Sequence, residues 1–201
     1  MKRNKKMGLF TKPSTLVLAA FFATLPVFSA TIENTSFAPD VTVNGKRLTL
    51  RGVSLLRHLV FIKAYTGAFY LAAGEPAAEA LGDVERRLVL HYFHAIPARE
   101  FADATTQMIE KNVSPDQYRQ LMPHIREMNG LYRDVKPGDR YIATFIPGTG
   151  TQLSLNDQLL GTVANSDFAA AFFSIWIGDH PIDKGFRDDL LNGSRLPSEQ
   201  E

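Results

Sequence analysis

The chain has 201 residues, of which 45% are apolar and 21% are charged, a composition typical of a globular protein and not of a disordered or fibrous one. It contains no cysteine, which excludes disulfide bonds, thiolate metal sites and thiol catalysis. The 22 basic and 21 acidic residues nearly balance, so the overall charge gives no reason to expect a nucleic-acid partner.

The first thirty residues differ from the rest of the chain. Five Lys and Arg and no acidic residue stand in MKRNKKMGLFTK, and the thirteen-residue apolar run LVLAAFFATLPVF and small residues follow. This order is typical of a secretory signal peptide, and we expect cleavage after Ser29 or Ala30. A membrane anchor is the alternative, but an apolar helix of this length spans only about 20 Å, less than the hydrocarbon core of a bilayer.

Removal of this peptide leaves 17 basic and 21 acidic residues, a net charge of about −4. We therefore predict that residues 31–201 form a single exported domain with no nucleic-acid partner and no stable membrane anchor. A domain without cysteine suits the bacterial periplasm, which is the expected location. The sequence gives no indication of the oligomeric state.

The first half of this domain is predicted to form strands. Asn44-Gly45 stands between alternating apolar residues and predicts a β-hairpin. The following stretch, residues 51–71 (RGVSLLRHLVFIKAYTGAFYL), is interpreted as one uninterrupted buried strand. Alternate residues of a strand share a face, and one face would then hold Arg57, Leu59, Phe61, Lys63 and Tyr65. Residues 86–96 predict a further strand, with one face formed by Leu88, Leu90, Tyr92 and His94.

The period of the apolar residues changes to that of a helix in the second half. Helices are predicted over residues 97–112, 115–129, 166–177 and 183–192, with strands between the second and the third. Ser114 and Gln117 form a capping box at the start of the second helix, and Gly130 is expected to end it. Strands followed by grouped helices predict an α+β fold with an antiparallel sheet.

Few residues carry recognisable chemistry. His91 and His94 lie three residues apart on a strand and would point to opposite faces, so we predict no metal site. Arg57 is the best candidate, because a guanidinium on an apolar wall can bind a carboxylate through two hydrogen bonds. The alternative is that Arg57 lies at the surface at the end of the strand, while the ammonium group of Lys63 extends into solvent.

Three segments resemble chalcone isomerase-like proteins: GVSLLRHLVFIKAYTGAFYL at 52–71, REFADATTQMIEKN at 99–112 and IWIGDHPIDKGFRDDLLNG at 175–193. The resemblance implies an open-faced β-sandwich, in which helices cover one side of a large antiparallel sheet and a ligand cleft lies between them. Arg57 matches the arginine that stabilises a phenolate nucleophile in the plant enzymes. The other functional positions that can be matched are changed here, mostly to apolar residues: Tyr65, Phe101, Met108 and Ile175.

Loss of these hydrogen-bonding groups implies that chalcone ring closure is not retained, because that reaction needs them to position the nucleophile and polarise the ketone. The resemblance implies instead a non-catalytic binder of an apolar small molecule with a carboxylate, either a fatty acid or haem. Arg57 would anchor the ligand, and the cleft would be shaped by Tyr65, Phe101, Met108 and Ile175. No cofactor is required, and haem would need an axial ligand, for which His58 is a candidate only if the strand is irregular.

Two other functions stay open at this point. The first is an isomerase or intramolecular lyase in which Arg57 acts as electrophile and Tyr65 as general acid, with the pKa of the phenol lowered by the nearby guanidinium. The second is a structural or interaction module whose cleft is filled by its own side chains.

Overall fold

The structure is a computed structural model that describes residues 29–58 and 62–193. The predicted signal peptide therefore lies outside the described residues, apart from its last two positions, and so do Leu59 and Phe61. In the described part of the chain, no helix is both long enough and apolar enough to cross a membrane.

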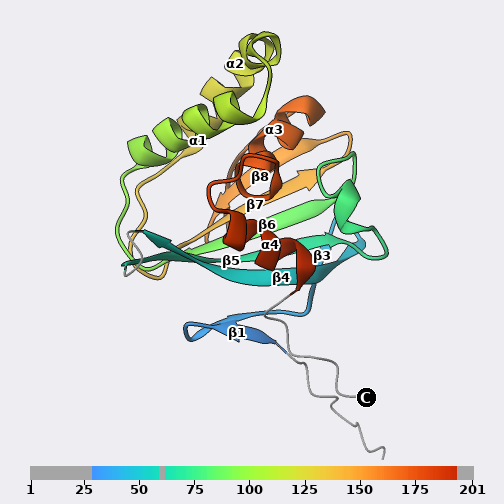
Figure 1. Cartoon of the computed structure of the whole chain (residues 1–201), viewed down its shortest axis with the longest axis vertical. Coiled ribbons are helices and arrows are strands. Elements are labelled where there is room, and N and C mark those ends of the chain that lie inside the picture. The colour runs from blue at the N-terminus through green and yellow to red at the C-terminus, as the bar shows by residue number, and fades with distance from the viewer. Residues whose placement is uncertain (1–28, 59–61, 194–201) are drawn as a thin grey trace, which may run out of the picture.

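An antiparallel sheet of seven strands forms the centre of the described chain (Figure 1). The strands follow chain order across the sheet: β3 (Asp40–Val43), β4 (Lys46–His58), β5 (Ile62–Ala72), β6 (Arg86–Tyr92), β7 (Arg140–Ile146), β8 (Gly150–Leu155) and β9 (Gln158–Val163). Each strand pairs with the strands that precede and follow it in the chain. The longest connection, between β6 and β7, contains two of the helices.

Helices cover one face of this sheet, as Figure 1 shows. They are α1 (Ala98–Asn112), α2 (Pro115–Leu131), α3 (Ser166–Ile177) and α4 (Lys184–Asn192), with a short 3₁₀ helix, η1, at Ala77–Glu79. A small hairpin of β1 (Ala30–Ile32) and β2 (Thr35–Phe37) lies below β4 on the other side. The predicted α+β fold, a large antiparallel sheet covered on one side by helices, is confirmed.

Local sequence signals explain most of the element boundaries. Asn44 and Gly45 both have positive φ angles, 49° and 79°, as the tight hairpin between β3 and β4 requires. Ser114 caps α2 with the complete capping box. The expectation that Gly130 ends α2 is wrong, because the helix continues to Leu131 and the residue after it turns into an extended conformation.

The interpretation of residues 51–71 as one strand is also wrong. β4 ends at His58 and β5 begins at Ile62, and the two strands pair with each other in the antiparallel sense. Arg57 lies opposite Lys63, while Leu56 lies opposite Tyr65, and an irregularity in the register separates these two pairs. Because consecutive residues of a strand alternate in direction, Arg57 does not share a face with Tyr65.

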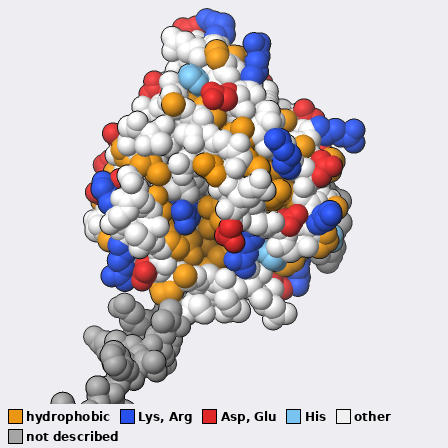
Figure 2. Space-filling model, turned by 180° about the vertical axis from the view of Figure 1, so that it is seen from behind, with side chains coloured by type: hydrophobic (Ala, Val, Ile, Leu, Met, Phe, Trp, Pro, Cys, Tyr) orange, Lys and Arg blue, Asp and Glu red, His pale blue; other side chains and the backbone are white. Residues whose placement is uncertain are grey.

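The core consists of two clusters of buried side chains, one on each face of the sheet. The larger cluster lies between the sheet and the helices, and the smaller one lies between the sheet and the β1–β2 hairpin. On the back of the molecule, charged side chains of both signs are spread over the surface and apolar side chains gather in a hollow (Figure 2). The larger cluster contains the site described next.

Candidate functional site

A cavity of about 620 Å³ lies between the sheet and the helices. Its volume is within the range of about 300–1,000 Å³ that is common for small-molecule pockets. Leu88, Leu90 and Ala143 of the sheet form one wall, and Phe101 of α1 with Phe172 and Ile175 of α3 form the opposite wall. Because this cleft is open, the structure argues against a module whose cleft is filled by its own side chains.

Four of the five residues expected to shape the site line this cavity: Arg57, Tyr65, Phe101 and Ile175. Met108 is not part of the lining and lies in the hydrophobic core, 9% exposed. It follows Phe101 by about two helical turns, which places it about 10 Å farther along α1. Ala104 and Thr105, one turn after Phe101, are the residues of α1 that reach the cavity in that direction.

Arg57 lies at the rim of the cavity, where its side chain is 45% exposed. Its Nη2 atom is 3.7 Å from Oε1 of Glu33, and Nζ of Lys63 donates to Oε2 of the same carboxylate at 2.5 Å. Glu33 belongs to the turn of the β1–β2 hairpin, on the side of the sheet away from the helices (Figure 1). One carboxylate of the protein therefore already faces the candidate anchor.

The pKa of Glu33 is lowered, chiefly by the hydrogen bond from Lys63 and further by the positive charges of Lys63 and Arg57. Glu33 has a positive φ angle of 49°, an uncommon conformation for a residue with a side chain. The hairpin turn thus holds an ionised carboxylate between two cations. Lys63, for which the sequence suggested no role, is its closer partner.

Tyr65 is buried and its hydroxyl oxygen accepts a hydrogen bond from Nε1 of Trp176 at 3.1 Å. Burial raises the pKa of Tyr65 well above its usual value, although the bond from Trp176 acts in the opposite direction. The expectation that a nearby guanidinium lowers this pKa is therefore wrong. A phenol that stays protonated is a hydrogen-bond donor, and it is a weaker acid than the isomerase alternative assumes.

Three further tyrosines line the cavity and were not selected as site residues from the sequence: Tyr92, Tyr132 and Tyr141. Their rings pack around Phe101, with centroids 5.3, 5.5 and 5.1 Å from its ring. The alternation of β6 offered a signal for Tyr92, because Leu88, Leu90 and His94 on the same predicted face also line the cavity. No sequence pattern pointed to Tyr132 or Tyr141.

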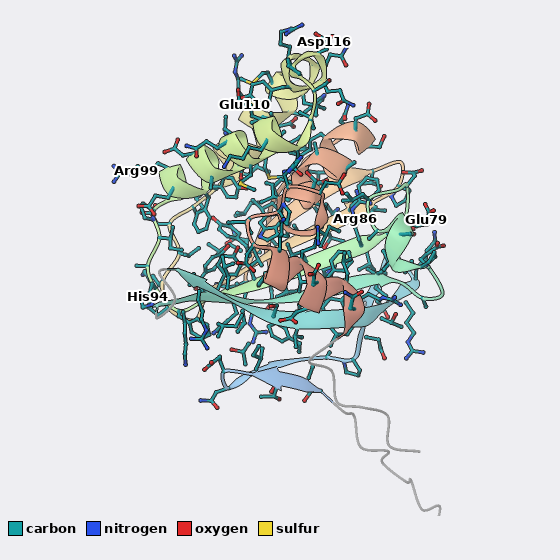
Figure 3. The ribbon with its side chains drawn as sticks, in the orientation of Figure 1. Glu79, Arg86, His94, Arg99, Glu110 and Asp116 are labelled. Atoms are coloured by element: carbon teal, nitrogen blue, oxygen red, sulfur yellow. The ribbon has the colours of Figure 1, made fainter. Side chains whose placement is uncertain are left out.

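Four polar residues of the lining are exposed to solvent, which places them at the mouth of the cavity: Arg57, His94, Glu100 and Asp183. Figure 3 shows His94 at one end of the sheet, two residues after the end of β6. His94 is exposed, and it is the sole histidine among the described residues that line the cavity. Within residues 29–58 and 62–193, no group of His, Asp or Glu side chains is arranged to hold a metal ion.

A second arginine, Arg86, is fully buried between α3 and the sheet but does not line the cavity (Figure 3). Its guanidinium lies 4.3 and 4.8 Å from the ring centroids of Phe145 and Phe173 and donates to the carbonyl oxygen of Gly82 at 2.6 Å. Burial lowers the pKa of Arg86 to about 10. We interpret Arg86 as part of the core, since aromatic faces and a carbonyl oxygen surround it.

The chain matches the family model described as chalcone isomerase-like over residues 29–192. A search of curated proteins finds no match. The crystal structure of a fatty-acid binding protein from Arabidopsis thaliana is similar, with a TM-score of 0.65 and 17% sequence identity, over 82% of this chain and 96% of that one. At this identity the structural likeness shows the shared fold, and the family match extends over most of the sequence. The chain therefore belongs to the chalcone isomerase-like family.

Proposed function

We propose that this protein binds a long-chain fatty acid, or a similar apolar molecule with one carboxylate, in the cavity between its sheet and its helices. The observation that carries the proposal is a cavity of about 620 Å³ with mainly apolar and aromatic walls and a guanidinium at its rim. A hydrocarbon chain gains free energy by leaving water for such walls. A carboxylate at its end would stay near the mouth, where Arg57 can bind it.

The similarity in fold to a fatty-acid binding protein supports a ligand of this kind. Haem, the other ligand suggested by the family, fits the described residues less well. A buried haem needs an axial ligand within the pocket. The imidazole of His94 is exposed at the mouth, and the side chain of His58, the candidate from the sequence, lies outside what the structure describes. We therefore propose a fatty acid as the ligand and treat haem as an alternative to be titrated in parallel.

Replacing Arg57 by glutamine is expected to weaken binding of hexadecanoic acid about tenfold, because one charge-assisted hydrogen bond at a partly exposed site is lost. Binding of hexadecanol, which has no carboxylate, should not change. Displacement of a fluorescent fatty acid measures both affinities. Arg47→Gln is the matched control, since Arg47 also lies on β4 in an ion pair, with Asp40, but outside the cavity lining. Equal affinity of the Arg57→Gln variant and the unaltered protein for the acid would rule out the anchor.

The ion pair of Arg57 with Glu33 provides a second arm of the same experiment. Glu33 competes with the carboxylate of a ligand for Arg57, so Glu33→Gln is expected to tighten the binding of hexadecanoic acid and to leave that of hexadecanol unchanged. Near neutral pH the lowered pKa keeps Glu33 ionised, so the competing charge is present when the two affinities are measured.

We further propose that the protein is exported and works in the periplasm after loss of its first 29 or 30 residues. The basic start of the chain and the thirteen-residue apolar run support this location. When the full chain is produced in a bacterium, the periplasmic extract is expected to contain a protein whose intact mass corresponds to a start at Ala30 or Thr31. Recovery of the uncleaved chain from the membrane fraction would contradict export as a free domain.

A further inference from the structure

The hydroxyl groups of the four tyrosines that line the cavity are not equivalent. Tyr132 shares a hydrogen bond of 2.7 Å with the hydroxyl of Thr105. Tyr141 donates to the carbonyl oxygen of Arg133 at 2.6 Å and accepts from the N–H of the same residue at 2.7 Å. The oxygen of Tyr65 accepts from Trp176. Each of these three hydroxyls is therefore held by another group of the protein.

Tyr92 differs from the other three, because its hydroxyl has no hydrogen-bond partner among the described residues. The side chain is 2% exposed and lines the cavity. Its ring is fixed by edge contacts with Tyr65 at 5.4 Å and Phe101 at 5.3 Å between centroids. Burial raises the pKa of Tyr92 well above its usual value, so the hydroxyl keeps its proton and can donate a hydrogen bond.

A buried donor of this kind favours a particular class of ligand. A wholly apolar chain seated against Tyr92 would shield the hydroxyl from water without offering it an acceptor, and an unsatisfied buried polar group is unfavourable. An oxygen atom in the ligand at the same place would accept the bond. The aromatic rings that pack against Tyr92 are much weaker acceptors than an oxygen atom, so a ligand oxygen would be the preferred partner of the hydroxyl.

The register of the sheet locates this donor relative to the proposed anchor. Leu56, Tyr65 and Tyr92 lie opposite one another on β4, β5 and β6. Arg57 follows Leu56, so Tyr92 lies two strand spacings, about 10 Å, from the strand that carries the anchor. Arg57 lies at the exposed rim, whereas the side chain of Tyr92 is buried in the cavity. An acceptor for Tyr92 that is separate from the carboxylate would therefore lie deeper, several carbons along the chain.

We propose that Tyr92 determines ligand specificity by donating a hydrogen bond to a mid-chain oxygen, so that the preferred ligands are long-chain acids with a keto or hydroxy group several carbons from the carboxylate. This inference rests on the proposed function for the position of the carboxylate. The contact with the second oxygen does not depend on that position and is tested separately.

The experiment compares hexadecanoic acid with a series of oxo-hexadecanoic acids that carry the keto group at C6, C8, C10 or C12. The protein is expected to bind one or two neighbouring isomers about tenfold more tightly than hexadecanoic acid. Tyr92→Phe should remove this preference and tighten the binding of hexadecanoic acid, because the hydroxyl that the apolar chain leaves without an acceptor is gone. Tyr141→Phe is the matched control, since the hydroxyl of Tyr141 is bonded to the backbone of Arg133, and it should retain the preference.

The outcomes separate this inference from the proposed function. Equal binding of all isomers, or a preference that survives in Tyr92→Phe, would overturn the role of Tyr92 alone. An equal loss of affinity for every acid in Tyr92→Phe would mean that Tyr92 holds the carboxylate, which also overturns it. Hexadecanones, which have the keto group but no acid, should show the same positional preference. If they bind with that preference while no acid binds, only the fatty-acid function fails, and if neither series binds, both proposals fail.

Discussion

Replacing Ala143 by phenylalanine is expected to weaken the binding of hexadecanoic acid by about 100-fold or more, since the added ring would occupy the space of the hydrocarbon chain. Ala143 lies in the middle of the sheet wall, between Leu88 of β6 and Leu153 of β8 in the register, and all three side chains line the cavity. The protein should stay folded, because the ring enters a space that is already open and displaces no packed side chain. Isothermal titration with the acid and a urea unfolding curve measure the two effects.

Ala73→Phe provides the control for this prediction. Ala73 is exposed in the turn that follows β5 and does not line the cavity, so the same added ring should leave the affinity unchanged. Unchanged binding in Ala143→Phe would show that the acid binds elsewhere on the protein. A large loss of stability in Ala143→Phe would show that the cavity cannot accept a ring at this position.

Replacing Gly52 by alanine is expected to lower the free energy of unfolding by about 3 kcal/mol, a large effect for one added methyl group. A Cβ atom at Gly52 would lie 2.0 Å from the carbonyl oxygen of Asp189 and 2.7 Å from that of Leu190. Both are backbone atoms of α4, so the whole helix would have to move away from β4. The hydrogen bond of 2.9 Å between Ser54 and Asp189 and the burial of Leu190 would be lost with it.

Gly130→Ala adds the same methyl group where no atom lies within 4 Å, near the end of α2. Because alanine favours a helix more than glycine does, this control should raise the free energy of unfolding by about 0.5 kcal/mol. Urea denaturation of the two variants and the unaltered protein gives both values. An effect of Gly52→Ala as small as that of Gly130→Ala would mean that α4 contributes little to the folded state.

The parts of the fold that depend on neighbouring residues were predictable from the sequence. The Asn44-Gly45 hairpin and the capped start of α2 rest on contacts within a few residues, and the structure has both. The layered arrangement followed from runs of strand patterns and helix patterns that are grouped separately along the chain. In contrast, the chain reversal between His58 and Ile62 carries no glycine, proline or asparagine that would mark a turn. The apolar run therefore resembled one continuous strand.

The candidate site depends more on contacts between distant residues. Glu33 meets Arg57 from a separate hairpin, and the hydroxyl of Tyr65 is bonded to Trp176, 111 residues away. The pKa of Tyr65 was expected to fall but is raised, chiefly because the side chain is buried. This burial depends on contacts with distant residues that the sequence alone does not reveal. Arg57, Phe101 and Ile175, which the resemblance assigned to one cleft, line one cavity, whereas Met108 is not among the lining residues.

The chain between α3 and α4 gives the cavity a connection to the last helix. Ile182 and Asp183 border the cavity, and Asp183 also caps α4 by accepting a hydrogen bond from the N–H of Phe186 at 2.7 Å. A ligand in contact with both residues binds only when this segment has its folded position. The free energy of ligand binding therefore adds to the free energy that favours packing of α4 on the sheet. Amide hydrogen exchange in residues 184–192 would then slow as the cavity fills. Hydrogen exchange in α4 would thereby report whether the cavity is occupied, although no residue of α4 lines it.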